Sequence, residues 1–295
     1  MKKVILTIAA IIALSFTLNA GTVTKSFNNK GFKGLDVSFR FDAEVIQSDK
    51  YSVVLEFEEE YAKYLVVKQS GDVLHIKFED LPRKLQSTDQ HDVFKATISM
   101  PVLEYLSMSG ACKFNTTSKF DLGSNPFTAK ISGASRINNL EMRASDARIY
   151  LSGASSMTMV GDFTNVNMEL SGACHADFDV VADELDTEVS GASKVQIKAN
   201  VNKLDVECSG ASKAQIEGKT RELDIECSGA CSVNTENLVA EDVSVDCSGA
   251  SKARVRVLKS LDVDLSGASS CYYNADNGID LTMDISRGSS LKRVK

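Results

Sequence analysis

Apolar and polar residues alternate along the first part of the chain, between residues 22 and 100. Leu35, Val37 and Phe39 are separated by polar residues, and the same period of two recurs at residues 53–57, 74–78 and 94–100. Such alternation is typical of β-strands that bury one face. We therefore expect residues 21–100 to form an irregular β region.

Beyond Pro101 the tripeptide Ser-Gly-Ala recurs along the rest of the chain. Self-similarity at a nearly fixed period, here about 19 residues, is the sequence signature of a solenoid. The serines of the intact copies are Ser109, Ser132, Ser152, Ser171, Ser190, Ser209, Ser228, Ser248 and Ser266, and a degenerate copy begins at Ser286.

The pattern within one repeat predicts a coil of short strands. Leu204, Val206 and Cys208 alternate with Asp205 and Glu207, and the alternation resumes after the tripeptide. Glycine suits the corner because a positive φ is open to it at no steric cost. A single coil buries too little apolar surface to fold alone, so the coils must stack.

The repeat period also bears on handedness and domain organisation. Left-handed β-helices depend on a strict coil of ~18 residues, whereas parallel β crossovers are generally right-handed. The steps here are unequal, since the step from Ser109 to Ser132 is longer than the step from Ser171 to Ser190. We therefore predict an all-β fold in which residues 101–295 form a right-handed parallel β-helix with Ser-Gly-Ala corners. Residues 21–100 are expected to pack on this solenoid or cap it.

The extreme N-terminus has a different character. Lys2 and Lys3 precede an apolar stretch, residues 4–18, and small Ala20 precedes Gly21. This order predicts a secretory signal peptide over residues 1–20 and export to the periplasm or the cell surface. No later apolar run approaches the ~20 residues of a membrane-spanning helix, so we expect no transmembrane segment in the mature chain.

Composition narrows the possible partners. The formal net charge is −7, which argues against a nucleic-acid ligand because phosphates require a basic face. The chain has seven cysteines and contains no Cys-x-x-Cys motif, so we expect no metal site. Cys208, Cys227 and Cys247 precede the repeated serines where other copies carry apolar residues. These positions favour buried thiols, and disulfides between stacked coils are the alternative.

Stacking the repeats in register predicts two charged columns on the surface. Acidic residues stand two positions before successive serines, at Glu169, Glu188, Glu207, Glu226, Asp246, Asp264 and Asp284. Basic residues, including Lys194, Lys213 and Lys252, stand four positions after them. The acidic column is either an ordinary solvated face or a binding stripe for divalent cations such as calcium or for a cationic partner. Like charges at coil spacing repel, so something must offset the acidic column.

An enzyme that processes polysaccharides is the main alternative from another functional class, because paired carboxylates can cleave glycosidic bonds. The acids of the repeat are spread evenly over the coils instead of clustering at one depth. The chain also lacks tryptophan, a common stacking surface for sugars. The repeated serine has no fixed His or Asp partner. We expect no catalytic residues.

Several landmarks outside the repeat carry a resemblance to a known family. They are Gly34-Leu35-Asp36-Val37, Asp72-Val73-Leu74-His75-Ile76, and Pro101-Val102-Leu103-Glu104 leading into the first Ser-Gly-Ala. In this order they resemble the GIN domain, the family of auto-transporter adhesin head domains common in exported proteins of Bacteroidetes-type bacteria. The resemblance implies a β-helix-like fold and an adhesin-like role. It brings no catalytic or ligand-binding residues.

Together these observations predict an exported, non-enzymatic β-solenoid that acts as a binding or surface-interaction module. Its expected partner is a surface glycan or protein, and no cofactor is expected unless the acidic column binds calcium. A structural protein of the cell envelope is the other non-enzymatic alternative.

Overall fold

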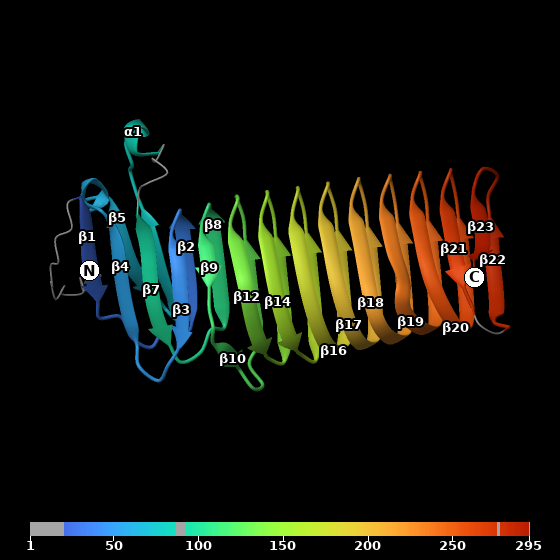
Figure 1. Ribbon diagram of the computed structural model, residues 1–295, viewed down its shortest axis with the longest axis horizontal. Helices are drawn as coiled ribbons and strands as arrows, with labels where there is room; N and C mark the ends of the chain where they lie inside the picture. The colour runs from blue at the N-terminus through green and yellow to red at the C-terminus, as the bar shows by residue number, and fades with distance from the viewer. Residues whose placement is uncertain (1–20, 87–92, 276–277, 295) are drawn as a thin grey trace, which may run out of the picture.

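The computed structural model describes residues 21–86, 93–275 and 278–294 and forms an elongated stack of β coils (Figure 1). The predicted signal peptide, residues 1–20, lies outside the described residues. The N-terminal strands occupy one end of the stack, and the repeated coils run from them to the other end.

The region before the first Ser-Gly-Ala corner contains strands and two short helical turns. Its elements are β1 (Thr22–Phe27), β2 (Gly34–Phe39), β3 (Asp42–Gln47), β4 (Ser52–Glu58), η1 (Glu59–Tyr61), β5 (Leu65–Ser70), β6 (Val73–Phe78), α1 (Arg83–Gln86) and β7 (Phe94–Met100). The strands of the repeat region are β8 (Tyr105–Gly110), β9 (Lys113–Asn115), β10 (Lys119–Asp121), β11 (Phe127–Ile131), β12 (Arg136–Arg143), β13 (Asp146–Leu151), β14 (Ser156–Asp162), β15 (Asn165–Leu170), β16 (His175–Val189), β17 (Lys194–Cys208), β18 (Lys213–Cys227), β19 (Ser232–Cys247), β20 (Lys252–Leu265), β21 (Ser270–Asn274), β22 (Asp280–Ile285) and β23 (Ser290–Val294).

Each coil is flattened and contributes one strand segment to each of two sheets. β17 is 15 residues long, starts after one corner, bends midway and ends before the next corner. We call face A the sheet made by segments that follow a corner and face B the sheet made by segments that precede one. Neighbouring coils pair in parallel and in register, so that Lys194 lies beside Lys213 on face A and Cys208 beside Cys227 on face B.

The path of the chain gives the solenoid its hand. The side that faces the viewer in Figure 1 is face A, and the coils advance from left to right. The chain runs from the corners down face A and returns up face B. This path is a right-handed coil, so the predicted right-handed parallel β-helix is confirmed. Inward side chains such as Leu204 and Val206 are fully buried between the two sheets.

The Ser-Gly-Ala tripeptides form the narrow edge along the top of Figure 1. Each corner glycine adopts a positive φ, for example +72° at Gly191. The backbone of one corner bonds to the next, since the Ala192 amide donates to the Gly172 carbonyl at 2.7 Å. The Ser190 hydroxyl donates to the Leu170 carbonyl at 3.1 Å, which links adjacent coils as well.

The coils begin before the first recognisable repeat. β2 and β3 pair in parallel with β8 and β9, and β6 and β7 form a further layer beyond them. At the corner between β2 and β3, Phe39 takes the place of glycine with φ of 89°. Its carbonyl accepts a hydrogen bond of 2.6 Å from the Ala111 amide, as the corner glycines do. The antiparallel strands β1, β4 and β5 cover the N-terminal end of the stack.

All seven cysteines are free and buried. Cys208, Cys227 and Cys247 stack directly on one another at the inner side of face B, beside the corners. Their column continues with Leu265, which confirms that the thiols occupy positions of ordinary apolar side chains.

Candidate binding faces

The structure brings the predicted acidic column together on face B. Each of its members lies directly beside the next in the parallel register, without a break, over seven coils. We call this column the acidic stripe: Glu169, Glu188, Glu207, Glu226, Asp246, Asp264 and Asp284. A second, parallel acidic row runs beside it and is interrupted by Ser244: Asp186, Asp205, Asp224 and Asp262.

Neighbouring carboxylates affect the middle of the acidic stripe. The pKa of Glu226 is raised, first by partial desolvation and then by the neighbouring carboxylates of Glu207, Asp224 and Asp246. A shallow hollow of about 250 Å³ lies along this part of the stripe, between Glu188 and Asp246, with the corner serines at its rim. The stripe is therefore an exposed, strongly negative surface with unrelieved repulsion at its centre.

The acidic stripe is also the surface at which the sequence leaves calcium binding open. Within the ranges that the structure describes, no group of three or more His, Cys, Asp or Glu side chains is placed to hold a metal ion. The stacked acids project in parallel from successive coils, and parallel side chains do not converge on one point. The arrangement suits an extended cationic surface better than a single ion.

Relieving the repulsion should stabilise the protein. We expect Glu226→Gln to raise the free energy of unfolding at pH 7 by about 0.5 kcal/mol, because it removes like charges from adjacent strands. A raised carboxyl pKa means that the folded state binds the proton more tightly, so the gain should shrink as the pH falls toward the range where Glu226 protonates. Urea denaturation at pH 7 and at pH 4.5 measures both effects.

Glu44→Gln is the matched control, because the strand neighbours of Glu44 are the neutral residues Thr97 and Asn115. It should change stability little at either pH. Equal effects of the two substitutions would show that repulsion along the acidic stripe does not cost stability.

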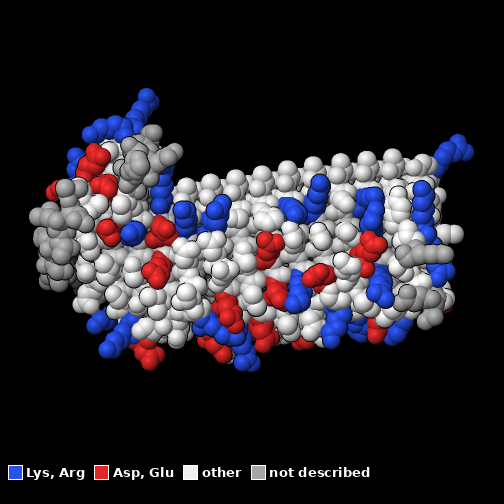
Figure 2. Space-filling model, viewed as in Figure 1, with Lys and Arg blue, Asp and Glu red and all other residues white. Residues whose placement is uncertain are grey.

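The predicted basic column lies on the other side of the corner edge, on face A. Lys194 and Lys213 are neighbours in the register, and Lys252 follows after Ser232. Lys194 donates to the side chain of Gln196 at 2.7 Å. Lys252 lies over the ring of Tyr272, 4.8 Å from its centroid. Figure 2 looks onto face A and shows Lys and Arg side chains in a broken row below the corners. The predicted acids and lysines thus belong to two separate surfaces.

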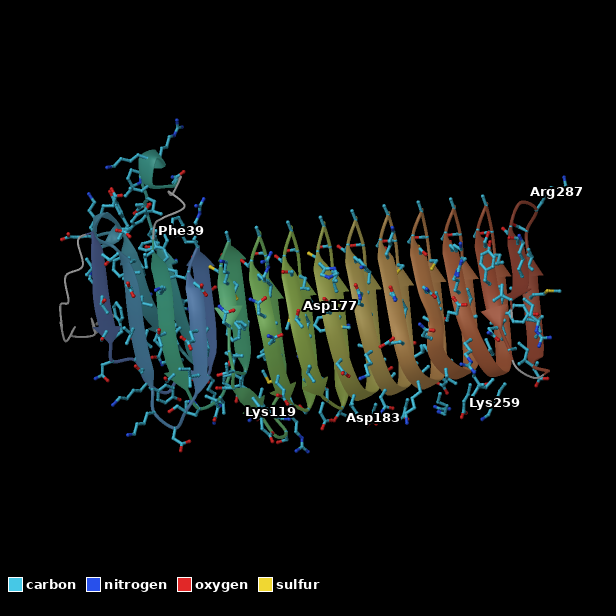
Figure 3. The ribbon with its side chains drawn as sticks, viewed as in Figure 1. Phe39, Lys119, Asp177, Asp183, Lys259 and Arg287 are labelled. Carbon is cyan, nitrogen blue, oxygen red and sulfur yellow. The ribbon has the colours of Figure 1, made fainter. Side chains whose placement is uncertain are left out.

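A second feature of face A is a column of uncharged and acidic polar side chains beside the basic one, six positions after each corner serine from Ser109 to Ser228. We call it the polar column: Asn115, Asn138, Thr158, Asp177, Gln196, Gln215 and Asn234. From Thr158 to Asn234 its members are direct neighbours in the register. Figure 3 places Asp177 in the middle of face A, well away from Asp183 and Lys259 on the edge opposite the corners.

The polar column lines a hollow of about 320 Å³ on face A. The hollow lies where the strand register breaks: Gln215 pairs with Asn234, but Glu217 pairs with Asn237, so β19 carries an extra residue. It has both polar and apolar walls, and the side chain of Val160 at its margin is 49% exposed. The main polar groups that surround it are Asp177, Asp179, Gln196, Lys198, Gln215, Glu217, Asn234 and Asn237.

A similar break accompanies a hollow near the N-terminal end of the polar column. The register of β12 against β14 shifts at Asn138 and Asn139, and Asn139 has a φ of 52°. A hollow of about 510 Å³ lies here. Side-chain amides are linked across it, since Asn138 donates to Asn115 at 3.0 Å and Asn115 donates to Asp42 at 2.7 Å. Both hollows on face A therefore combine polar side chains with a local bulge.

The sequence contains a signal for the polar column that the charge pattern obscured. Amide, hydroxyl and carboxyl side chains recur six positions after the corner serines from Ser109 to Ser228, with the same period as the charged columns. The hollows themselves depend on the bulges. The step from Ser228 to Ser248 is longer than the step from Ser209 to Ser228, which indicates an inserted residue without giving its position.

Fold and surface together define the class: an elongated parallel β-solenoid that presents long, regular columns of side chains on two flat faces. Residues 31–200 and 172–276 match a family model described as "Putative auto-transporter adhesin, head GIN domain". The chain belongs to this family, which confirms the resemblance seen in the sequence.

Three solved structures are similar over most of the chain. One, from Parabacteroides distasonis, is described as a putative adhesin, with 14% identity, a TM-score of 0.52 and coverage of 92% of this chain and 97% of that one. A putative adhesin from Parabacteroides merdae has 13% identity, a TM-score of 0.48 and coverage of 94% and 98%. A putative lipid binding protein from P. distasonis has 14% identity, a TM-score of 0.43 and the same coverage. The first of these likenesses supports the fold.

No curated protein matches the chain. None of the helices in the described ranges has the length and apolar character that a bilayer crossing requires.

Proposed function

We propose that the protein is an exported, non-enzymatic binding module that holds an extended surface polysaccharide against face A. Membership of an adhesin-head family supports a binding role. The observation that carries the proposal is the polar column, which runs through a hollow built from successive coils. The family and the N-terminal sequence support export.

The chemistry of the hollow favours a polyhydroxylated ligand. Amide side chains such as Gln196 and Gln215 both donate and accept hydrogen bonds, and Asp177 accepts them, so together they can satisfy a series of hydroxyl groups. The parallel strands repeat these groups at ~4.8 Å along the axis. A regular ladder of this kind suits a polymer with a repeating unit better than a compact ligand. The exposed apolar margin at Val160 provides contact with the less polar sides of such a chain.

An enzymatic role has less support from the same hollow. Glycosidic cleavage needs two carboxyl groups with separate acid and base roles. Asp179 is already engaged in an ion pair with Lys198 at 3.2 Å. The acids of face B are spread evenly along the stripe. These features support binding without turnover.

The acidic stripe is a second candidate surface, with a different partner. The pKa of Glu226 is raised first by partial desolvation and then by crowded negative charge, and a cationic protein surface would neutralise that charge. We propose that such a partner contacts Glu188, Glu207 and Glu226 together with their stacked neighbours. A purely structural role in the envelope requires neither surface.

Protease shaving of intact cells tests the location on which the proposal rests. We expect the protein to be cleaved on whole cells while a periplasmic marker stays intact. Pull-down with the purified protein then separates the partners: polysaccharide retained through face A supports the proposal, whereas a protein retained through the acidic stripe supports the second candidate. Protection from protease together with no retained partner would contradict a surface-binding role.

A further inference from the structure

The two ends of the solenoid differ in how their last strands are covered. At the N-terminal end, β1 and β4 close face A and β5 closes face B in antiparallel pairs. At the other end, β22 and β23 pair in parallel with β20 and β21 on their inner sides. Among the described residues, no strand pairs with the outer edges of β22 and β23. Such an edge is a template for pairing with another chain.

The apolar interior is also open at this end. Leu281 and Met283 continue the inward columns of Leu261 and Val263, which are each 1% exposed. Leu281 is 39% exposed and Met283 is 60% exposed. At the opposite end the large interior side chains of Phe57 and Tyr61 are at most 1% exposed. The C-terminal coil therefore presents both unpaired backbone groups and the uncovered end of the core.

The two edge strands carry opposite charges on their outward sides. Asp280 and Asp284 project from β22 on face B, where Asp284 ends the acidic stripe. Lys292 projects from β23 on face A, 5.9 Å from the ring centroid of Tyr272 in the neighbouring coil. Arg287 stands at the last corner, at the same end of the molecule (Figure 3). One edge is thus acidic and the other basic.

A two-fold axis along the strand direction matches these edges to each other. It places β22 of one copy antiparallel to β23 of a second copy, on both sides of the interface. Each acidic edge then meets a basic edge, both sheets continue across the junction, and the apolar ends of the two cores face each other. Such an interface closes on itself, so it forms a pair of molecules and not a fibre.

We propose that the protein forms a symmetric dimer through its C-terminal coils, with β22 of each copy paired to β23 of the other. The partner is a second copy of this chain because the two edge strands of one coil are complementary in charge. A second copy also buries the exposed apolar end of the core, and its own core end is buried in the same contact. In this dimer face A of each copy continues into face B of the other, so the two copies of face A lie on opposite sides of a common axis. The proposal does not depend on which ligand face A binds.

Sedimentation velocity of the purified protein over a range of concentrations tests the proposal. We expect a reversible dimer, and Met283→Lys should raise its dissociation constant about tenfold or more, because it puts a charge into the apolar contact. Val160→Lys is the matched control, since Val160 is 49% exposed on face A and lies outside the C-terminal coil. It should leave the dimer intact. Circular dichroism confirms that each variant is folded.

Charge reversal identifies the pairing itself. Asp284→Lys and Lys292→Asp should each weaken self-association, because each puts like charges across both halves of the interface. A mixture of the two variants should form a heterodimer of near wild-type affinity, since both contacts then join opposite charges. A monomer at all concentrations would overturn the proposal. A dimer that ignores Met283→Lys, or variants whose mixture shows no recovery, would place the contact elsewhere and overturn it as well.

Discussion

Gly191→Ala should destabilise the protein by about 3 kcal/mol or more, whereas Gly71→Ala should cost about 1 kcal/mol. Both glycines have a positive φ, +72° and +58°. A Cβ atom at Gly71 would meet nothing within 4 Å, so that substitution carries the conformational cost alone. A Cβ atom at Gly191 would lie 2.5 Å from the carbonyl oxygen of Gly172 and 2.9 Å from its nitrogen.

The larger loss follows from the stacking of the corners. The Gly172 carbonyl also accepts the hydrogen bond from Ala192, so the coils cannot separate to admit a methyl group without weakening this ladder. Urea denaturation of the two variants and the wild type measures the difference. Similar losses at Gly191 and Gly71 would mean that glycine is required at the corners for its φ alone.

Removing one whole coil should leave a folded protein, and removing half of one should not. Deletion of residues 191–209 joins Ser190 to Gly210 and takes out one whole repeat. β16 and β18 both pair with β17 in a continuous register, so they can pair with each other once the deletion has removed β17. In a solenoid each coil contributes its own stability and that of its interfaces, so a single loss is tolerated.

We expect this deletion to keep one cooperative thermal transition with a melting temperature lowered by a few degrees. Deletion of residues 191–200 is the control. It removes the corner and the face A segment but keeps the face B segment, so the following coils lose their register and the cooperative transition should disappear. Circular dichroism melting distinguishes the two. Loss of folding in both deletions would contradict a modular stack.

The repeat region could be predicted from the sequence because one local pattern fixes it. Ser-Gly-Ala marks each corner, and the regular period of the repeat places Glu188, Glu207 and Glu226 beside one another. The acidic stripe followed from counting residues. The separation of this stripe from Lys194 and Lys213 follows from the flat shape of the coil, in which the corner divides two sheets.

Other features could not be predicted, for identifiable physical reasons. The coil of β2 and β3 lacks the tripeptide because Phe39 occupies the corner, where its ring packs against Phe78 and Phe94 at 5.2 and 5.1 Å. Aromatic packing thus replaces the usual glycine signal. The hollow on face A depends on the bulge between Gln215 and Glu217, and the periodic pattern does not show which residue of a longer repeat is extruded.

Binding of polysaccharide by the polar column of face A can be tested with a glycan array. The measurement compares the wild-type protein with Gln215→Arg, which fills the hollow with a longer charged side chain, and with Glu207→Gln on face B. We expect the wild type and Glu207→Gln to bind the same extended glycans and Gln215→Arg to lose at least about tenfold in affinity. Binding that survives Gln215→Arg but is lost with Glu207→Gln would contradict it, as would a folded wild-type protein that binds no glycan.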